Sequence, residues 1–208
     1  MNTQRRAHEI LEFWFGQRPY VGVERRMRFW FGDERAPELQ PQTDEAIRLR
    51  FGTLVADAAA GKLDHWESSP RRRLALILLL DQFPRNIYRG TSGAFDHDRA
   101  AVLLTLSGMQ LGADAALDPV ERLFFYMPLQ HSEAAEVQAE SVAAFTRLAS
   151  EAPDALRELL GSVVQFAKLH SDIVSRFGRF PHRNQALGRA STSDELAWLA
   201  SEGQRFGQ

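Results

Sequence analysis

The chain has 208 residues, of which 44% are hydrophobic and 25% are charged, a composition typical of a compact soluble domain. The 25 basic and 27 acidic residues give a net charge of −2, which argues against a general nucleic-acid-binding protein because such proteins carry excess positive charge. The absence of cysteine excludes disulfide scaffolds, thiol nucleophiles and cysteine-ligated metals. We expect a single domain over residues 1–208.

The sequence also argues against a membrane protein. Residues 1–6 are polar and lack the apolar core of a signal peptide. The longest purely apolar run, Leu74–Leu80, has seven residues, whereas a membrane-spanning helix needs about 20. We therefore expect a cytoplasmic protein with no membrane contact.

The first predicted helices are short and apolar on one side. Thr3 is a suitable N-cap for a helix that runs to about Phe15, where Gly16 ends it. A second, aromatic helix is expected over about residues 24–31. The aromatic side chains expected in the core from these two helices are Phe13, Trp14, Phe15, Phe29, Trp30 and Phe31.

The next two helices have clear start and stop signals. A loop flanked by Pro37 and Pro41 precedes a helix that Thr43 or Asp44 opens and Gly61 ends. Residues 71–82 form the following helix, which starts after Ser69-Pro70 and ends at Phe83-Pro84. Because this helix is apolar on every side over Leu74–Leu80, we expect it in the middle of the protein.

Four more helices are predicted before the last one. The first starts at Asp96 or Asp98, and the second starts at the capping signal Asp118-Pro119-Val120-Glu121 and is kinked or ended by Pro128. Ser132 would cap the third. Beyond Pro153, apolar residues spaced by four and three over six turns predict a long helix that packs antiparallel to a neighbour.

A last helix follows the capping box formed by Thr192 and Glu195. The sequence has no segment with the alternating apolar pattern of a strand. It therefore predicts an all-α fold of about eight or nine helices, joined by short loops into antiparallel hairpins.

Three polar segments lie at predicted helix ends, where the fold does not require them. They are Asp81–Gly90 after the most buried helix, Tyr126–Glu133 around the expected break, and Arg176–Asn184 after the long helix. In the first and third, an Arg-Asn pair follows Phe-Pro, directly or after one inserted residue. Because both copies follow buried helices, we expect them at the same rim of the bundle.

Arginine supplies nearly all of the positive charge. Lys62 and Lys168 are the lysines, so 23 of the 25 basic residues are arginines. A GC-rich genome explains arginines scattered over helix surfaces, whereas a cluster suggests planar forks placed to bind carboxylate or phosphate. The clustered arginines are Arg85, Arg89, Arg176, Arg179, Arg183 and Arg189.

These segments suggest a ligand site. A small anion would be bound by Arg85, Asn86, Arg179, His182, Arg183 and Asn184. His131 and Glu133, or Asp81, are the candidates for proton transfer, because a carboxylate beside an imidazole orients the ring and stabilises its charged form. Hydrolysis or group transfer would be the reaction class.

The same residues also have purely structural interpretations. Arginine and asparagine at helix C-termini bond the last carbonyls, and Asp81 would then pair with an arginine in a buried ion pair. His131 and Glu133 would cap the break at Pro128. His170, in the apolar stripe of the long helix, is expected to be a hydrogen-bonded core histidine.

The signatures of common cofactor and metal sites are missing. The sequence has no phosphate-binding loop, no Gly-x-Ser-x-Gly, no His-Glu-x-x-His and no dinucleotide-binding glycine motif. His131 and Glu133 would point to different sides of a helix, which does not suit a shared metal. We therefore expect no cofactor and no metal.

Four segments carry a family resemblance: residues 10–16 (ILEFWFG), 74–90 (LALILLLDQFPRNIYRG), 125–133 (FYMPLQHSE) and 176–184 (RFGRFPHRN). They resemble a bacterial family catalogued as domain of unknown function 924. The resemblance implies a helical-hairpin fold similar to tetratricopeptide repeats, although the consensus of that repeat is not visible here. It implies no activity and no catalytic residues.

Two functional hypotheses follow. The first is a closed pocket that binds a small anionic molecule, with possible proton-transfer chemistry. The alternative is an interaction scaffold without catalysis, in which stacked helices form an open groove and arginines capture the terminal carboxylate of a peptide. If neither holds, the polar motifs serve only to hold the fold together.

Overall fold

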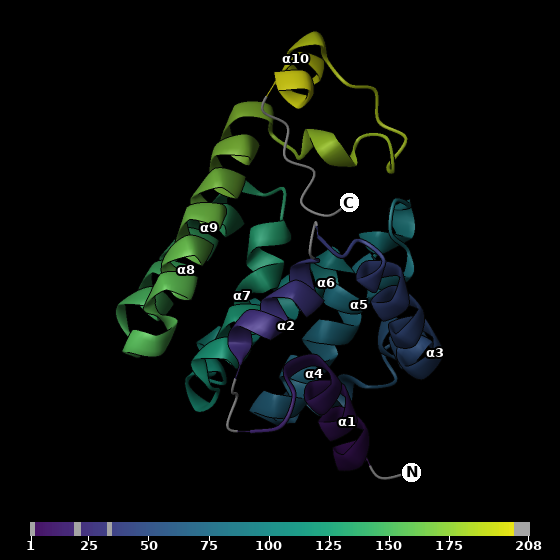
Figure 1. Ribbon diagram of the computed structural model, residues 1–208, viewed down its shortest axis with the longest axis vertical. Coiled ribbons are helices and arrows are strands. Elements are labelled where there is room, and N and C mark those ends of the chain that lie inside the picture. Colours follow the sequence, from purple (N-terminus) through teal and green to yellow (C-terminus); the bar gives the residue numbers. More distant parts are fainter. Residues whose placement is uncertain (1–2, 19–21, 33–34, 202–208) are drawn as a thin grey trace.

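The computed structural model describes residues 3–18, 22–32 and 35–201, and its regular structure in these ranges is entirely helical (Figure 1). The predicted all-α fold is therefore confirmed. The α-helices are α1 (Thr3–Phe15), α2 (Val23–Phe31), α3 (Leu39–Ala59), α4 (Pro70–Leu80), α5 (Gln82–Ile87), α6 (Asp98–Gln110), α7 (Pro119–His131), α8 (Ala135–Ser150), α9 (Arg157–Phe177) and α10 (Ser193–Ser201). Short 3-10 turns are η1 (Asp64–Ser68), η2 (Ser92–Ala94), η3 (Asp114–Ala116), η4 (Asp154–Leu156) and η5 (Pro181–Arg183).

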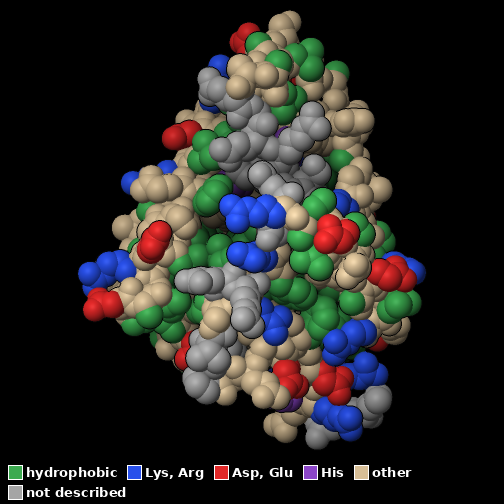
Figure 2. Space-filling model, in the orientation of Figure 1, with side chains coloured by type: hydrophobic (Ala, Val, Ile, Leu, Met, Phe, Trp, Pro, Cys, Tyr) green, Lys and Arg blue, Asp and Glu red, His purple; other side chains and the backbone are tan. Residues whose placement is uncertain are grey.

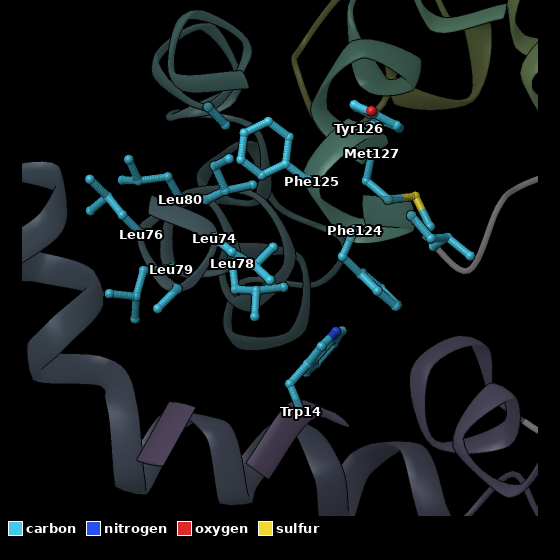
Figure 3. Close-up of a cluster of buried hydrophobic side chains, with 14 of the residues drawn as sticks. Trp14, Leu74, Leu76, Leu78, Leu79, Leu80, Phe124, Phe125, Tyr126 and Met127 are labelled. Carbon is cyan, nitrogen blue, oxygen red and sulfur yellow. The ribbon is translucent and has the colours of Figure 1, made fainter. Parts of the chain in front are cut away.

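Helix α4 lies at the centre, as its apolar sequence predicts. Every side chain from Leu74 to Leu80 is at most 4% exposed, because α1, α3, α6 and α7 pack around the helix. Figure 3 shows α4 leucines facing Phe124 and Phe125 of α7, with Trp14 of α1 below them. Burial of this many apolar side chains is the main stabilising contribution to the fold.

The aromatic residues of α1 and α2 join this core. Trp14 and Trp30 both pack on Phe124, with ring centroids 5.4 and 4.6 Å apart. The Nε1 of Trp30 also donates a hydrogen bond to the carbonyl of Trp14. Phe31 is the exception to the expected aromatic core: it lies at the margin and is 47% exposed.

Two prolines that indicate a helix boundary in the sequence lie in the first turn of a helix instead. Helix α3 starts at Leu39 rather than at Thr43 or Asp44, so Pro41 lies in its first turn. Similarly, Phe83-Pro84 does not end the helical region: the break falls at Asp81, and Pro84 lies in the first turn of α5. Both are tolerated because backbone N–H groups in a first turn have no intrahelical acceptor.

The expected helix break at Pro128 is also wrong. Helix α7 continues through Pro128 to His131, since its buried packing against four neighbouring helices offsets the missing hydrogen bond. Ser132 does not cap α8, which begins at Ala135; its Oγ instead accepts the N–H of Ala134 at 3.2 Å. The capping boxes predicted at Asp118 and at Thr192 are confirmed.

A small second apolar cluster lies beyond the main core. It is formed by Ile173 and Val174 of α9, Phe180, and Trp198 of α10. We call the end of α9 together with the segment that follows it, residues 169–201, the C-terminal lobe. In Figure 1 this lobe extends above the rest of the bundle.

The surface carries mixed charge. On the face in Figure 2, acidic and basic side chains are scattered around a short row of basic side chains near the centre. Within the described ranges, no helix combines the length and apolar character that a membrane crossing requires. The single domain and the likeness to tetratricopeptide repeats stay predictions.

Candidate functional site

Asp81 is the centre of a buried polar cluster. It lies at the break between α4 and α5 and is 0% exposed. Its Oδ1 is 2.8 Å from Nδ1 of His131 and 3.1 Å from Nη1 of Arg85. Its Oδ2 accepts a hydrogen bond of 2.5 Å from Nε2 of Gln82. One buried carboxylate therefore binds a ring, a guanidinium and an amide.

Two arginines from distant parts of the chain share a second carboxylate. Arg85 of α5 contacts both oxygens of Asp98, at 2.8 and 2.9 Å. Arg183 of η5 donates to Oδ2 of the same residue at 3.2 Å. We call the five connected residues the central network: His131, Asp81, Arg85, Asp98 and Arg183. It unites members of all three predicted polar segments.

The charges in this network fix the protonation of His131. Burial raises the pKa of Asp81, but attraction to Arg85 and His131, together with the hydrogen bonds, outweighs burial and leaves that pKa below its usual value. Burial and then repulsion from Arg85 lower the pKa of His131, despite the opposing attraction of Asp81. His131 is therefore neutral at neutral pH, beside an ionised carboxylate.

This protonation state also fixes the tautomer. An ionised carboxylate only accepts hydrogen bonds, so Nδ1 of His131 must carry the ring proton and donate it to Asp81. Nε2 is then the acceptor nitrogen, and it makes no hydrogen bond to the residues that the structure describes. The ring is 14% exposed. This is the geometry of a general base oriented by a carboxylate.

Arg183 has fewer hydrogen bonds than its burial requires. It is 6% exposed, and its Nε is buried with no hydrogen-bond partner among the described residues. The guanidinium stacks between two rings, 4.7 Å from the centroid of Phe95 and 4.5 Å from that of Phe180. Burial lowers the pKa of Arg183 to about 10, with Asp98 opposing the shift and Arg85 adding to it.

Glu133 belongs to a different set of contacts. It accepts hydrogen bonds of 2.7 and 2.9 Å from Arg189 and one of 2.8 Å from the N–H of Phe180. Burial raises the pKa of Glu133, but these hydrogen bonds and the charge of Arg189 outweigh burial and lower it. An ionised carboxylate with these partners is suited to holding the C-terminal lobe, not to donating a proton.

Two further predicted ligand residues lie inside the C-terminal lobe. Arg179 forms a two-pronged pair with Glu195, at 2.6 and 2.8 Å. Asn184 donates to Oγ of Ser191 at 3.0 Å and accepts from Nε of Arg189 at 2.9 Å. Both side chains connect η5 to α10 and do not touch the central network.

Of the remaining predicted residues, Asn86 and Arg89 lie against α3, and His182 lies in the C-terminal lobe. Asn86 and Arg89 both bind Asp44 of α3, at 2.7 and 2.8 Å, and thus hold α5 against α3. His182 packs on Phe180, with ring centroids 5.5 Å apart, and burial lowers the pKa of His182 to about 3.

His170 is a core histidine, as expected. It is 4% exposed and hydrogen-bonds the carbonyl of Phe166 at 2.8 Å. Burial lowers the pKa of His170 to about 3.

Asp98 is the site residue that the sequence did not identify. Its place at the start of α6 predicts only that it stabilises the N-terminus of that helix, because acidic side chains interact favourably with the helix dipole there. No local signal shows that two arginines converge on it. Among the described residues, no three His, Asp or Glu side chains are grouped to hold a metal ion.

The motifs and the fold recur in other bacterial proteins. A family model described as bacterial protein of unknown function, DUF924, matches residues 10–203. A solved structure of a protein of unknown function from Agrobacterium tumefaciens is similar, with 33% identity, a TM-score of 0.76, and coverage of 95% of this chain and 98% of that one. No curated protein matches the chain. Because the family match includes all four motif segments, the chain belongs to the DUF924 family of bacterial proteins of unknown function.

Proposed function

We propose that the protein binds a small anionic ligand through Arg183, with His131, at the other end of the central network, as a proton acceptor. The observation that carries the proposal is the buried, under-bonded guanidinium of Arg183. Arginine has five N–H donors, whereas among the residues that the structure describes Arg183 makes one hydrogen bond, to a carboxylate that Arg85 already occupies. Leaving charged donors buried without acceptors is destabilising by several kcal/mol. The oxygens of a carboxylate or phosphate would supply the missing acceptors.

The surroundings of Arg183 support binding rather than structural pairing alone. The rings of Phe95 and Phe180 hold the guanidinium plane between them, so it is already oriented for a two-pronged contact. The central network also lies where the main core meets the C-terminal lobe. Ligand sites occur preferentially at such junctions.

The His131–Asp81 pair adds a chemical capability. With its proton on Nδ1, His131 would accept a proton at Nε2 from a water molecule or a hydroxyl group of the ligand, and Asp81 would stabilise the resulting cation. Hydrolysis or group transfer on an anionic substrate is the reaction class that fits this arrangement.

The alternative, a peptide-binding scaffold, has one observation in its favour. A surface groove of ≈ 420 Å³ lies between α3, α4 and α6 and is lined mainly by alanine and leucine. Its polar lining includes Asp64 and Glu67, and no arginine is among the described residues that line it. The groove therefore does not suit capture of a peptide carboxylate, which favours the site at Arg183.

Thermal unfolding in the presence of anions tests the proposal. We expect inorganic phosphate or a small carboxylate to raise the melting temperature of the wild type, since ligand at 100 times its Kd stabilises by about 2.7 kcal/mol. Arg183→Gln should abolish the shift. Arg157→Gln, which changes a 72% exposed arginine on α9, is the control and should retain it. An equal shift in Arg183→Gln, or none in the wild type with any anion, contradicts the proposal.

A further inference from the structure

The contacts between the C-terminal lobe and the rest of the molecule differ from those within it. Inside the lobe, Phe180 and Trp198 are buried against the end of α9 at 0% and 6% exposure, and Arg179 and Asn184 bind Glu195. These contacts hold the lobe together. Its apolar cluster is separate from the main core.

Across the junction, carboxylates make the hydrogen bonds, and Arg183 also stacks on Phe95. Glu133, which follows α7, binds Arg189 and the N–H of Phe180, while Asp98 of α6 binds Arg183. The side chains of Glu133 and Arg189 are 28% and 24% exposed, so salt screens their attraction. Because the two apolar clusters are separate, we expect separation along this junction to expose less apolar surface than unfolding either part, and so to be easier.

The proposed ligand site lies beneath this junction. Arg183 and Arg85 are 6% and 8% exposed; Asp98 contacts both, but it reaches Arg183 only through Nη1. Most of the surface of both guanidinium groups is therefore covered, and the buried Nε of Arg183 is covered completely. Opening of the junction would expose these donors to an anion in solution.

We propose that the C-terminal lobe is a movable cover over the anion site, held closed by the Glu133–Arg189 and Asp98–Arg183 contacts. The inference rests on the proposed function for its ligand, but the motion itself is independent of it. When the junction opens, Arg183 leaves Asp98 and becomes accessible. A bound anion then supplies the acceptors that Arg183 lacks, and the cover closes over the ligand.

Distance measurement in solution tests the motion directly. The chain has no cysteine, so Arg99→Cys on α6 and Asp194→Cys on α10, both exposed, can carry spin labels without background. We expect one main distance, with a second, longer population that grows at high salt. Glu133→Gln should increase the open-to-closed ratio roughly fivefold, the effect of losing one ion pair.

A matched variant controls for the loss of an ion pair elsewhere. Glu151→Gln removes the contact with Arg122, of 2.6 Å, beyond the end of α8, far in sequence from the junction. It should leave the distance distribution unchanged. A single distance that neither Glu133→Gln nor 1 M salt alters would overturn the cover.

Inorganic phosphate separates this inference from the proposed function. Hydrogen exchange should be faster in residues 169–201 than in α4. In Glu133→Gln, exchange in residues 169–201 should be faster than in the wild type. Phosphate should slow exchange in the wild type only at the lobe and the central network. If the lobe opens but phosphate slows exchange nowhere, the cover is supported and phosphate binding at Arg183 is wrong. If lobe amides exchange as slowly as those of α4 in both proteins, the cover is wrong.

Discussion

His131 and Asp81 form a pair whose protonation also depends on a third residue. Burial, and after it repulsion from Arg85, lowers the pKa of His131, while attraction to Asp81 raises it. The position of Arg85, on the first turns after the break at Asp81, thus helps to keep the ring neutral and able to accept a proton. Single charges decide the chemistry here because burial weakens the screening by water.

We predict that Arg85→Gln raises the pKa of His131. The substitution removes a repulsive charge and leaves the attraction of Asp81, so the protonated ring becomes more favourable. Arg183 still neutralises Asp98 in this variant. A ¹⁵N NMR titration of the histidine rings measures the change. Arg89→Gln, which breaks the pair with Asp44, should not move it, and an unchanged His131 in Arg85→Gln would refute this account.

At the scale of helices, close approach depends on a few small residues. Gly108 of α6 faces the central part of the core. A Cβ at this position would lie 2.6 Å from Cζ of Phe125 and 2.8 Å from Cδ of Arg73. Neither neighbour can move readily, because Phe125 is fully buried and Arg73 bonds the carbonyl of Leu104 and Oγ of Ser107.

We therefore expect Gly108→Ala to lower the free energy of unfolding by about 1–3 kcal/mol, the usual result of overpacking a core. Gly161→Ala on α9 is the matched control. A Cβ there meets no atom within 4 Å, so the higher helix propensity of alanine should stabilise the protein by roughly 0.5–1 kcal/mol. Urea denaturation of both variants measures the difference. Similar effects of the two substitutions would show that α6 does not pack this closely.

The prolines at this scale show how tertiary packing overrides local signals. Pro41, Pro84 and Pro128 each indicate a helix boundary in the sequence, yet all three lie inside helices. For the first two the reason is local, because the N–H groups of a first turn make no intrahelical hydrogen bond that proline could remove. For Pro128 it is tertiary, since α7 is buried among other helices.

For the whole molecule, buried histidines make stability depend on pH. Burial holds the pKa of His170 and His182 at about 3, against 6.5 ordinarily. Between these values the unfolded chain binds more protons than the folded one. The free energy of unfolding should therefore fall as pH falls below 6.5, by up to about 1.4 kcal/mol per pH unit for each histidine.

Urea denaturation at pH 7, 6 and 5 tests this dependence above the range in which most carboxylates titrate. The lowered pKa values of Asp81 and Glu195 contribute stability that is lost only at lower pH. Replacing both histidines by glutamine should reduce the slope of the curve between pH 7 and 5, and the slope that remains includes the contribution of His131, whose pKa is also lowered. A wild type equally stable at pH 7 and pH 5 would contradict the burial of these rings.

Local patterns are enough to predict the helical fold, the central place of α4, the two capping boxes and the family, because these depend on residues within a few positions of each other. A repeated motif at helix ends also indicates that Arg85 and Arg183 belong together, and an expected break at Pro128 places His131 at another helix end. Which charges meet is known only from the packed structure. His131 and Asp81 are 50 positions apart, and Arg183 and Asp98 are 85 apart. Any of several arginines and acidic residues could form such a pair. Only the packing of the helices brings Asp98 between Arg85 and Arg183. The same packing pairs Asn86 with Asp44 and Arg179 with Glu195.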